Sequence, residues 1–448
     1  DLERVGVVTA QPADPFRRSG SMGSGGSWGV RAWYLPLRKA SAQARDVLVA
    51  AAAAQWGVPA AQCRLERGEV VHEASRRRLG IGELAGAAAA LPLPAEPALR
   101  PKSGLRYTGR KVPRVDLPAK VRGERVFASD IERPGMVYAC AHLSPVFGAE
   151  LEGFDKESAT VVPGVLDVVA IPGGAAVVAS NSWAALRGAE ALRIRFKPTP
   201  HDRLDSATIS RQMRAGLADG AQPINARADG DWAAAAGSAH RIVEAEYEVP
   251  YLSHAPMEPW NCTVEFDADG GLHVWAPVQT QDRNRNAAAA AAGVAPDKVR
   301  LHTTLLGGGF GRRLGSDGIA AAVLTARAVR RPVKFFWRRE DEFGQGWYRP
   351  AQVARLRAVL DANGRVAGLH VRTAGPALSA SFSPQGLPAG QLDGSSVQTI
   401  RESRYQPGAF HVEWVRVDQP VPMAPWRSVG ATQNGFFLEC FIDEVGRT

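Results

Sequence analysis

The sequence predicts a mixed α/β protein, of the α+β class, that is divided into several domains. Its 448 residues exceed the roughly 250–300 residues at which a single hydrophobic core stops growing. Hydrophobic residues make up 45% of the chain and charged residues 22%, which is the balance of a folded globular protein. Short alternating segments typical of strands are interspersed with alanine-rich segments typical of helices, and we find no short-period repeat.

The first part of the chain predicts two helices and a linker. Residues 40–58, ASAQARDVLVAAAAAQWGV, are strong helix formers that end at a glycine and a valine. A second helix is expected in residues 82–94, GELAGAAAALPLP, where the prolines stop it. Residues 92–118 are rich in Pro, Lys and Arg, so an extended linker is expected at 101–118.

Residues 119–197 predict a second region, made of short strands. VYACAHL, VLDVVAIP and AAVVAS are apolar runs punctuated by Pro and Gly, as short strands are. WAALRGAEALRIRF then predicts a helix that leads into a strand. Residues 198–238 are polar and are expected to form a connector.

A third region begins near residue 239. HRIVEAEYEVP predicts a strand, and NCTVEF with LHVWAP predicts a hairpin around DADGG. NRNAAAAAAGVAPDKV predicts a helix that ends at Gly293. KVRLHTTLL predicts a strand, LLGGGFGRR contains the glycine run, and DGIAAAVLTARAVRR predicts a helix. RPVKFFWRR then predicts one strand, and VARLRAVLDANGRVAGLHVRTAG predicts two strands around a turn.

Charge and cysteine content argue against several classes of protein. The net charge is +9, but the arginines are spread along the chain and form no basic stripe interleaved with aromatics, so no nucleic-acid partner is expected. The four cysteines include no CxxC pair, which argues against a zinc ribbon or an iron–sulfur cluster on this chain and leaves disulfides open. No apolar run is long enough to cross a bilayer.

The glycine run at residues 307–311 predicts a close backbone approach. A strand, a glycine loop and a helix in that order can hold an anionic ligand on backbone N–H groups and the helix N-terminus. The loop fails the GxxxxGK[ST] pattern, and counting six places for GxGxxG from Gly307 or Gly309 reaches Arg312 or Leu314, which disfavours an NAD-binding dehydrogenase. On this pattern alone, a tight turn with Phe310 in the core is an equal alternative.

Three further segments flank this loop in order along the chain. SHAPMEPWNCTVEF precedes WAPVQTQDRNRN and GGGFGRR, and APWRSVGATQNGFFLECFIDE follows near the end. With their spacing, these motifs closely resemble the molybdenum-binding subunit of the xanthine dehydrogenase and aldehyde oxidase family, and within it the isoquinoline 1-oxidoreductase beta subunit group. The stretch from SGSMGSGGSWG onward has the character of that group, and LPAKVRGERVFASDIERPGMVYA resembles the start of the family's hammerhead domain.

The resemblance implies a domain organisation. Residues 1–100 and 239–448 are then parts of a molybdopterin-binding domain, and residues 119–197 form a hammerhead-like domain. The chain begins at Asp1 without a methionine and ends abruptly at Thr448. Because the family's general-base glutamate and a second pterin-contacting segment are expected outside these ends, we expect the chain to be the interior of a longer subunit. The glutamate is expected beyond Thr448, and no catalytic base is assigned here.

The resemblance also implies the cofactor and the residues that hold it. The family binds molybdenum through a pterin dithiolene, here expected as molybdopterin cytosine dinucleotide, with no metal-ligating side chain from this chain. Gln279 matches the glutamine that donates to the apical oxo group, with Gln281 as the neighbour most easily mistaken for it. The family's loop beside the metal, where the ring covers the dithiolene, matches four consecutive residues: Gly308, Gly309, Phe310 and Gly311.

Near the C-terminus the resemblance places Arg427 at the substrate pocket, so the expected catalytic residues are Gln279, Phe310 and Arg427. Arg427 is also expected to contact the cofactor, together with Gly430 and the 431–434 segment that starts at Ala431, and with the GSGGSW run at 23–28. His254 and Glu258 are expected to be structural. Some purine-oxidising members carry a glutamate just after the loop, where this chain has Arg312, Arg313 and Leu314, which argues against a purine substrate.

The implied function is hydroxylation of an N-heteroaromatic compound or oxidation of an aldehyde, with oxygen from water. Electrons are expected to leave through a separate [2Fe–2S] ferredoxin-like subunit, with a cytochrome c as a further candidate partner. Location in the periplasm or at the membrane is a family expectation. The alternative is a non-catalytic scaffold member of the same fold that lacks cofactor.

Overall fold

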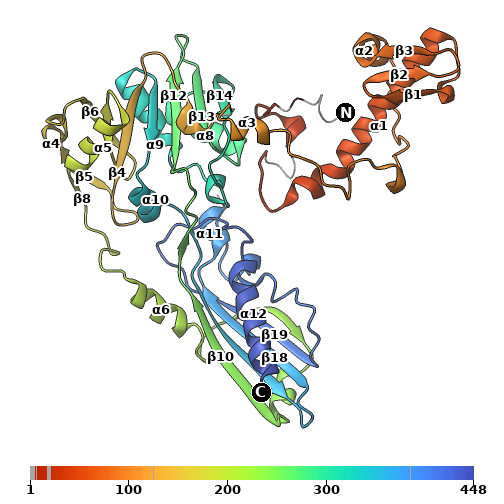
Figure 1. The fold of residues 1–448 in the computed structure, drawn as a ribbon. Helices are drawn as coiled ribbons and strands as arrows, with labels where there is room; N and C mark the ends of the chain where they lie inside the picture. The colour runs from red at the N-terminus through yellow and green to blue at the C-terminus, as the bar shows by residue number, and fades with distance from the viewer. Residues whose placement is uncertain (1–5, 7, 18–21, 125, 384) are drawn as a thin grey trace. The chain divides into compact units, whose positions relative to one another are not determined.

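The computed structural model describes residues 6, 8–17, 22–124, 126–383 and 385–448. The chain divides into two compact units (Figure 1). We call them the N-terminal unit, Asp1–Ala10 with Ser24–Arg125, and the main unit, Gln11–Gly23 with Val126–Thr448. None of the helices in the described ranges is both long enough and apolar enough to span a bilayer.

The N-terminal unit packs two helices against a small antiparallel sheet. Helix α1, Trp28–Trp56, ends at Gly57, which takes the left-handed conformation at φ 67°. The predicted end of this helix is confirmed, but it begins twelve residues earlier than the 40–58 segment and contains Pro36. Alanines on α1 allow α2 to approach closely. The other elements are β1 Cys63–Glu66, β2 Glu69–His72, β3 Arg77–Gly80, α2 Ile81–Ala89 and α3 Leu117–Val121.

The main unit contains a seven-stranded mixed sheet in the order β14-β13-β12-β15-β4-β7-β6. The predicted hairpin around DADGG is confirmed, since β12 and β13 pair antiparallel with Thr263 opposite Trp275. Strand β4, from the 119–197 region, pairs parallel with β15, so strands from both sides of residues 198–238 share one sheet. The strands are β4 Val137–Leu143, β6 Val165–Ile171, β7 Gly174–Ala179, β12 Asn261–Phe266, β13 Leu272–Ala276, β14 Val299–Thr303 and β15 Val333–Phe336.

Alanine-rich helices cover this sheet. Helix α8, Gln281–Ala292, ends at Gly293 as predicted, with φ 70° at the glycine. Helix α9, Ile319–Val329 (Figure 1), buries Ala321, Ala322 and Ala326 in the same core as α8 and the sheet. The remaining elements around this sheet are α4 Lys156–Thr160, α5 Ser182–Ala191, α10 Arg339–Gln345, and the two-stranded pairs β5 Leu151–Asp155 with β8 Arg193–Phe196 and β11 Leu252–Ser253 with β16 Tyr348–Arg349.

A second sheet of the main unit has five strands in the order β10-β17-β18-β19-β9. Helix α12, Ala431–Gly446, lies along this sheet (Figure 1). Its Phe437 and Phe441 are buried in one core with Trp414. Strand β9 comes from the segment predicted to be a connector and pairs with β19. The elements are β9 Ile224–Asp229, β10 Arg241–Val249, β17 Gln352–Leu360, β18 Val366–Gly375, β19 Ala409–Arg416, α6 Ser206–Ala215, α7 Trp232–Gly237, α11 Leu378–Phe382 and α12.

The mixed α/β class is therefore confirmed, and so is the helix predicted in DGIAAAVLTARAVRR, which is α9. A 3₁₀ turn at Arg312–Leu314 and residues 315–318 separate Gly311 from the start of α9 at Ile319. The N-terminus of α9 is capped by the buried Gly318, against which Trp260 packs. The backbone N–H groups that the loop itself offers are therefore separate from the N-terminus of α9.

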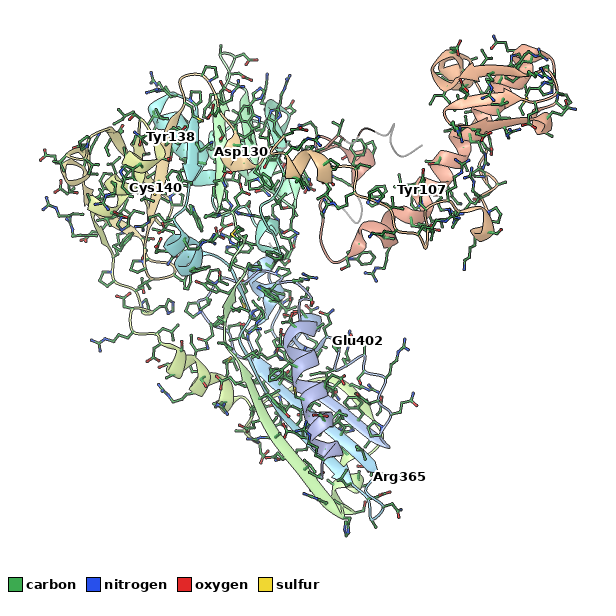
Figure 2. All side chains as sticks on the ribbon, viewed as in Figure 1. Tyr107, Asp130, Tyr138, Cys140, Arg365 and Glu402 are labelled. Atoms are coloured by element: carbon green, nitrogen blue, oxygen red, sulfur yellow. The ribbon has the colours of Figure 1, made fainter. Side chains whose placement is uncertain are left out.

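The four cysteines are unpaired with one another. Cys140 lies on β4 inside the main unit (Figure 2), and burial raises the pKa of its thiol, as it does for Cys262. Among the residues that the structure describes, no three His, Cys, Asp or Glu side chains gather in a way that could hold a metal ion.

Candidate functional site

Three segments far apart in the sequence meet around Gly311. A methyl group built onto Gly311 would lie 1.6 Å from the carbonyl oxygen of Pro425, so the two backbones touch. The ring of His254 lies against the same carbonyl, with 3.2 Å between its Nε2 and the Pro425 oxygen. The motifs HAPMEP, GGGFG and PWRSVG, which the sequence could only order along the chain, thus form one contact region.

Gln279 lies beside this loop, between β13 and α8. Its Oε1 accepts a hydrogen bond from the Gly311 N–H at 3.3 Å, and its own backbone N–H donates to the Arg313 carbonyl at 2.8 Å. A methyl group on Gly309 would lie 3.0 Å from the same Oε1, so the glycine lets the amide approach. The alternative residue, Gln281, is buried at the start of α8, where its N–H donates to Met22.

The loop presents a row of backbone donors. The N–H groups of Gly308, Gly309 and Phe310 donate to no atom in the part of the chain that the structure describes, while the Gly307 N–H before them donates to Glu258 at 2.9 Å. The backbone is left-handed at Gly308, Phe310 and Gly311, with φ of 105°, 55° and 103°. Consecutive donors in such a bend form a concavity for a group rich in acceptor atoms.

Packing alone does not account for the backbone conformation of Phe310. A positive φ costs a non-glycine residue about 1–2 kcal/mol, and the Phe310 side chain is still 45% exposed. Its ring edge folds back over Gly308, where a methyl group would lie 3.0 Å from Cε2. The alternative of a core plug is therefore excluded, and the ring covers the loop from the solvent side.

Glu258 fixes the start of the loop. Its carboxylate accepts hydrogen bonds from the N–H of Gly307 at 2.9 Å, the N–H of Ser129 at 3.2 Å and the Asn261 side chain at 3.0 Å. The sequence predicts a structural role for Glu258 but not that its carboxylate binds the first N–H of the glycine loop. The signal was available, since a glutamate in a proline-rich turn ahead of a buried strand is a suitable acceptor for backbone N–H groups.

The two arginines after the loop anchor it to the interior. Arg312 and Arg313 are each 1% exposed. Arg312 pairs with Asp317 at 2.8 Å and with Glu342 at 2.7 Å, and Arg313 donates to the Glu258 carbonyl at 2.6 Å. Buried ion pairs of this kind fix geometry more than they add stability. Both side chains thus point into the protein.

Arg427 stands on a strained turn ahead of α12. Its side chain is exposed, and its guanidinium makes no hydrogen bond or ion pair within the described ranges. The next residues, Ser428 and Val429, both have positive φ, 76° and 53°, at a cost of about 1–2 kcal/mol each. Strain of this size persists only where the surroundings enforce it. Arg427 is therefore held by the turn, two residues after Pro425, and not by side-chain partners.

Gly430 and Ala431 make their contacts away from the glycine loop. A methyl group on Gly430 would lie 1.7 Å from the Ser395 carbonyl oxygen, and its N–H donates to Gln398 at 3.1 Å. The Ala431 N–H donates to Ser428 at 3.1 Å. Their backbone donors are thus used within the protein, and a cofactor contact through these two residues stays a prediction.

Only the first residue of the GSGGSW run belongs to the main unit. Gly23 forms an antiparallel bridge with Thr280, and a methyl group on it would lie 2.8 Å from the Gln279 carbonyl oxygen. Met22 accepts from the Gln281 N–H at 3.1 Å and donates to Asp282 at 3.0 Å. This segment therefore supports the turn that carries Gln279.

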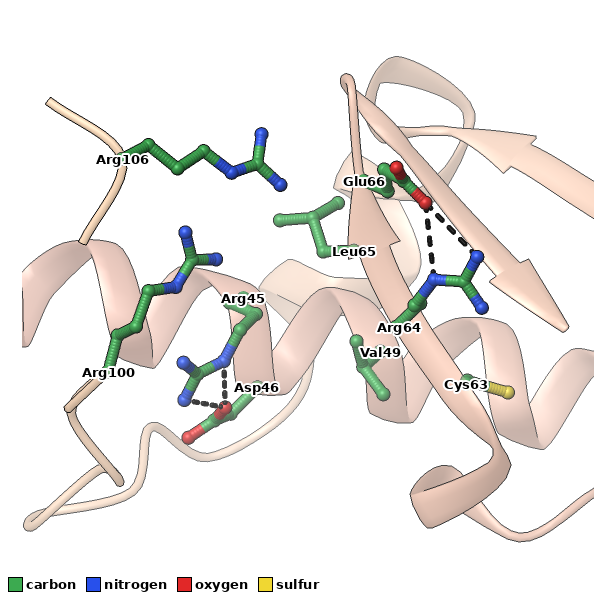
Figure 3. A pocket seen from close by; sticks show the side chains of 9 residues that line it. All are labelled: Arg45, Asp46, Val49, Cys63, Arg64, Leu65, Glu66, Arg100 and Arg106. Atoms are coloured by element: carbon green, nitrogen blue, oxygen red, sulfur yellow. Dashed lines mark hydrogen bonds and ion pairs between the residues drawn. The ribbon is translucent and has the colours of Figure 1, made fainter. Parts of the chain in front are cut away.

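The N-terminal unit has a separate groove of about 540 Å³ (Figure 3). Arg45, Arg64, Arg100 and Arg106 line it around Leu65. Both of its carboxylates are paired, Asp46 with Arg45 at 2.6 Å and Glu66 with Arg64 at 3.1 Å. The groove is lined by flexible charged side chains and lacks the closely packed backbone donors of the glycine loop, so the loop is the better candidate for a cofactor.

Comparison with known proteins decides the family. The family model described as the molybdopterin cofactor-binding domain matches residues 218–448. The chain belongs to this family. The match contains Gln279, the glycine loop and Arg427.

Curated relatives of this molybdopterin-binding chain support the assignment. It is 30% identical to the beta subunit of isoquinoline 1-oxidoreductase from Brevundimonas diminuta, over 100% of this chain and 63% of the relative. It is 28% identical to the membrane-bound aldehyde dehydrogenase [pyrroloquinoline-quinone] of Gluconacetobacter polyoxogenes, over 99% of this chain and 59% of the relative. The chain thus spans less than two thirds of the length of these relatives.

Solved structures share the fold. The quinoline 2-oxidoreductase of Pseudomonas putida 86 matches with a TM-score of 0.61 at 20% identity, covering 76% of this chain and 48% of that one. The aldehyde oxidoreductase of Desulfovibrio gigas matches with a TM-score of 0.58 at 18% identity, covering 82% of this chain and 45% of that one. At these identities the likeness shows the architecture of the molybdopterin-binding chain and nothing of its substrate.

The residues present fit a molybdenum–pterin group. Such a group carries many oxygen, nitrogen and sulfur acceptors, and the loop offers the backbone donors of Gly308, Gly309 and Phe310 beside the amide of Gln279. The glycines leave the space that side chains would fill. Gln279 and Gly308–Gly311 would hold the group. The domain boundaries and residue roles predicted from the sequence stay predictions.

Proposed function

We propose that this chain is the cofactor-binding part of a molybdenum-dependent hydroxylase subunit. One observation carries the proposal: the N–H groups of Gly308, Gly309 and Phe310 lie in succession beside the Gln279 amide, within the residues matched to the molybdopterin-binding family. A bound molybdenum–pterin group supplies two-electron oxidation with oxygen taken from water. The names of the relatives, which include isoquinoline and aldehyde oxidoreductases, support an N-heteroaromatic compound or an aldehyde as substrate.

Each site residue has a separate task in this proposal. The Gln279 amide, whose oxygen accepts a hydrogen bond from the Gly311 N–H, would act as a neutral polar group beside the cofactor. The Phe310 ring lies over the loop and keeps water away, which strengthens the hydrogen bonds below it. Arg427, exposed on its turn, orients the carbonyl or ring nitrogen of the substrate and stabilises negative charge there.

The finer assignments are also proposals. The pterin carries a cytosine dinucleotide, and a small [2Fe–2S] ferredoxin-like subunit accepts the electrons, with a cytochrome c as a further acceptor. Two relatives, one from isoquinoline 1-oxidoreductase and one from nicotinate dehydrogenase, are named as single subunits of their enzymes, which supports a complex of several chains. The complete protein works in the periplasm or at the membrane.

Metal analysis of the full-length protein, produced with its partner subunit, tests the proposal. We expect about one molybdenum per chain and a fluorescent pterin released on denaturation. The variant Gly309→Val should displace the Gln279 amide, because even a methyl group lies 3.0 Å from its oxygen, and should lose the metal. The control Gly220→Val adds its side chain in open space and should keep it. A well-folded full-length complex without molybdenum would refute the enzyme and favour the scaffold alternative.

A further inference from the structure

His254 is a buried group that the proposed chemistry does not use. It is 4% exposed, and both of its ring nitrogens face backbone carbonyl oxygens. Nδ1 lies 2.9 Å from the Trp347 oxygen, and Nε2 lies 3.2 Å from the Pro425 oxygen. Both partners are acceptors, whereas a neutral imidazole has one N–H to donate. Only the doubly protonated ring can donate to both carbonyls.

The shorter of the two contacts indicates to which carbonyl a neutral His254 ring donates its hydrogen bond. With the proton on Nδ1, the ring donates to Trp347 at 2.9 Å, and the lone pair of Nε2 then faces the oxygen of Pro425 at 3.2 Å. Two lone pairs at that separation repel each other. The Pro425 carbonyl is therefore the partner that gains a donor only when His254 takes up a second proton.

Pro425 is the point where this contact reaches the site. Its carbonyl oxygen packs against Gly311, whose N–H holds the Gln279 oxygen, and Arg427 follows two residues later on the strained turn. A shift of Pro425 thus changes the separation between the glycine loop and Arg427. We propose that His254 is a pH-dependent positioning residue: once acid adds a proton to Nε2, the Nε2–H fixes Pro425, and through it Arg427, relative to the glycine loop. The part concerning Arg427 rests on the proposed function.

The charges around His254 act in opposite directions. Burial lowers the pKa of His254, and the Arg312 guanidinium lowers it further, whereas the two carbonyls and Glu342 raise it; the net direction is down. Arg312 is ion-paired with Glu342 and Asp317. The groups of the Trp347 and Pro425 segments that contact the His254 ring are uncharged carbonyl oxygens. At neutral pH the ring is therefore uncharged, and acid adds the second N–H.

The direction in which stability changes with pH distinguishes a positioning role of His254 from a purely structural one. Because the folded-state pKa is below the unfolded value, the contribution of His254 to stability is present above about pH 6.5 and is lost as pH falls through the folded pKa. Over the same interval the Pro425 carbonyl gains its donor. Global stability should fall with acid while the turn at 425–430 becomes more ordered.

Two variants of His254 test the contributions of its two ring nitrogens separately. In His254→Gln the amide nitrogen takes the place of Nε2 and can donate to Pro425 at any pH. In His254→Asn the amide nitrogen takes the place of Nδ1 and can donate to Trp347 only. Asn is one methylene shorter than Gln and loses more packing, so the pH-dependent shift of the wild type between the two variants assigns the difference to the Pro425 contact.

Hydrogen–deuterium exchange of the 426–430 amides in the full-length complex is the main measurement, with the exposed 361–365 turn as an internal reference. At pH 7.5 the wild type should exchange like His254→Asn, and His254→Gln should exchange about two- to tenfold more slowly, the effect of one hydrogen bond. As pH is lowered through the folded-state pKa of His254, the wild type should approach the exchange of His254→Gln. With benzaldehyde and isoquinoline as probe substrates, KM should follow the same order while kcat changes less.

The result that overturns the inference is equal exchange in the two variants at every pH. If the variants fail to fold, the wild type alone decides, since its 426–430 amides must slow relative to the 361–365 turn as pH is lowered from 7.5 across the acid range in which the complex stays folded. Exchange needs no substrate and no turnover. A complex without molybdenum would thus refute the proposed function and still report on His254.

Discussion

Replacing Gly311 by alanine should separate the glycine loop from the Pro425 segment. The new methyl group would lie 1.6 Å from the Pro425 carbonyl oxygen and 2.7 Å from its carbon, so one backbone must move by well over an ångström. Neither atom belongs to a flexible side chain. The residue also has φ 103°, a conformation that alanine adopts at a cost of about 1–2 kcal/mol.

The magnitude follows from two additive effects. Overpacking in a well-packed site costs about 1–3 kcal/mol, which with the backbone strain gives a total of about 2–5 kcal/mol. Gly270→Ala is the matched control, since Gly270 has φ 80° in the DADGG turn and no atom within 4 Å of the added methyl group. It should show the backbone cost alone. The difference between the two variants isolates the contact with Pro425.

Thermal unfolding and molybdenum content of the full-length complex measure both consequences. Gly311→Ala should melt below Gly270→Ala and should lose most of its molybdenum, because the Gly311 N–H no longer positions Gln279. Gly270→Ala should keep the metal. If the two variants melt together and carry equal molybdenum, the convergence of the loop with Pro425 does not build the site, and the reasoning fails.

Two further predictions concern single side chains. Gln279→Ala should leave the thermal transition in place and slow turnover by about one to three orders of magnitude, the usual effect of one preorganised donor; an unchanged kcat would remove Gln279 from the site. Glu413 lies beside His370 and Arg372, which lower the pKa of its carboxyl to about 2. Its contribution to stability is therefore present above about pH 4.5 and lost as pH falls toward 2. The variant Glu413→Gln should reduce the dependence of the free energy of unfolding on pH over that interval. An unchanged dependence would show that the ion pairs of Glu413 with His370 and Arg372 add no stability in solution.

Elements with local signals were predictable. The hairpin of β12 and β13 turns at DADGG, and α8 stops at Gly293, because turn and cap glycines adopt positive φ wherever they stand. The strand VYACAHL is apolar enough to be buried from its own composition, and it is β4. In each case the deciding interaction lies within a few residues of the signal.

Elements that depend on distant partners were missed. Strand β9, INARAD, has weak β-propensity and forms because β19 offers it a ladder some 185 positions along the chain. Helix α1 starts ahead of Pro36, although proline disfavours a helix interior. The burial of Arg312 depends on carboxylates at 317 and 342, and a run of two arginines gives no sign of it.

The sequence by itself determined the class of the fold, the order of the motifs and the presence of a side-chain-free bend at 307–311. Only the tertiary structure decided what the bend meets: the Gln279 oxygen at Gly311, the Glu258 carboxylate at Gly307, and the Pro425 carbonyl where a side chain would otherwise stand. The physical reason is that a glycine records the need for space or for positive φ but not the identity of the atom that requires it. That atom lies on another segment, and folding alone brings it there.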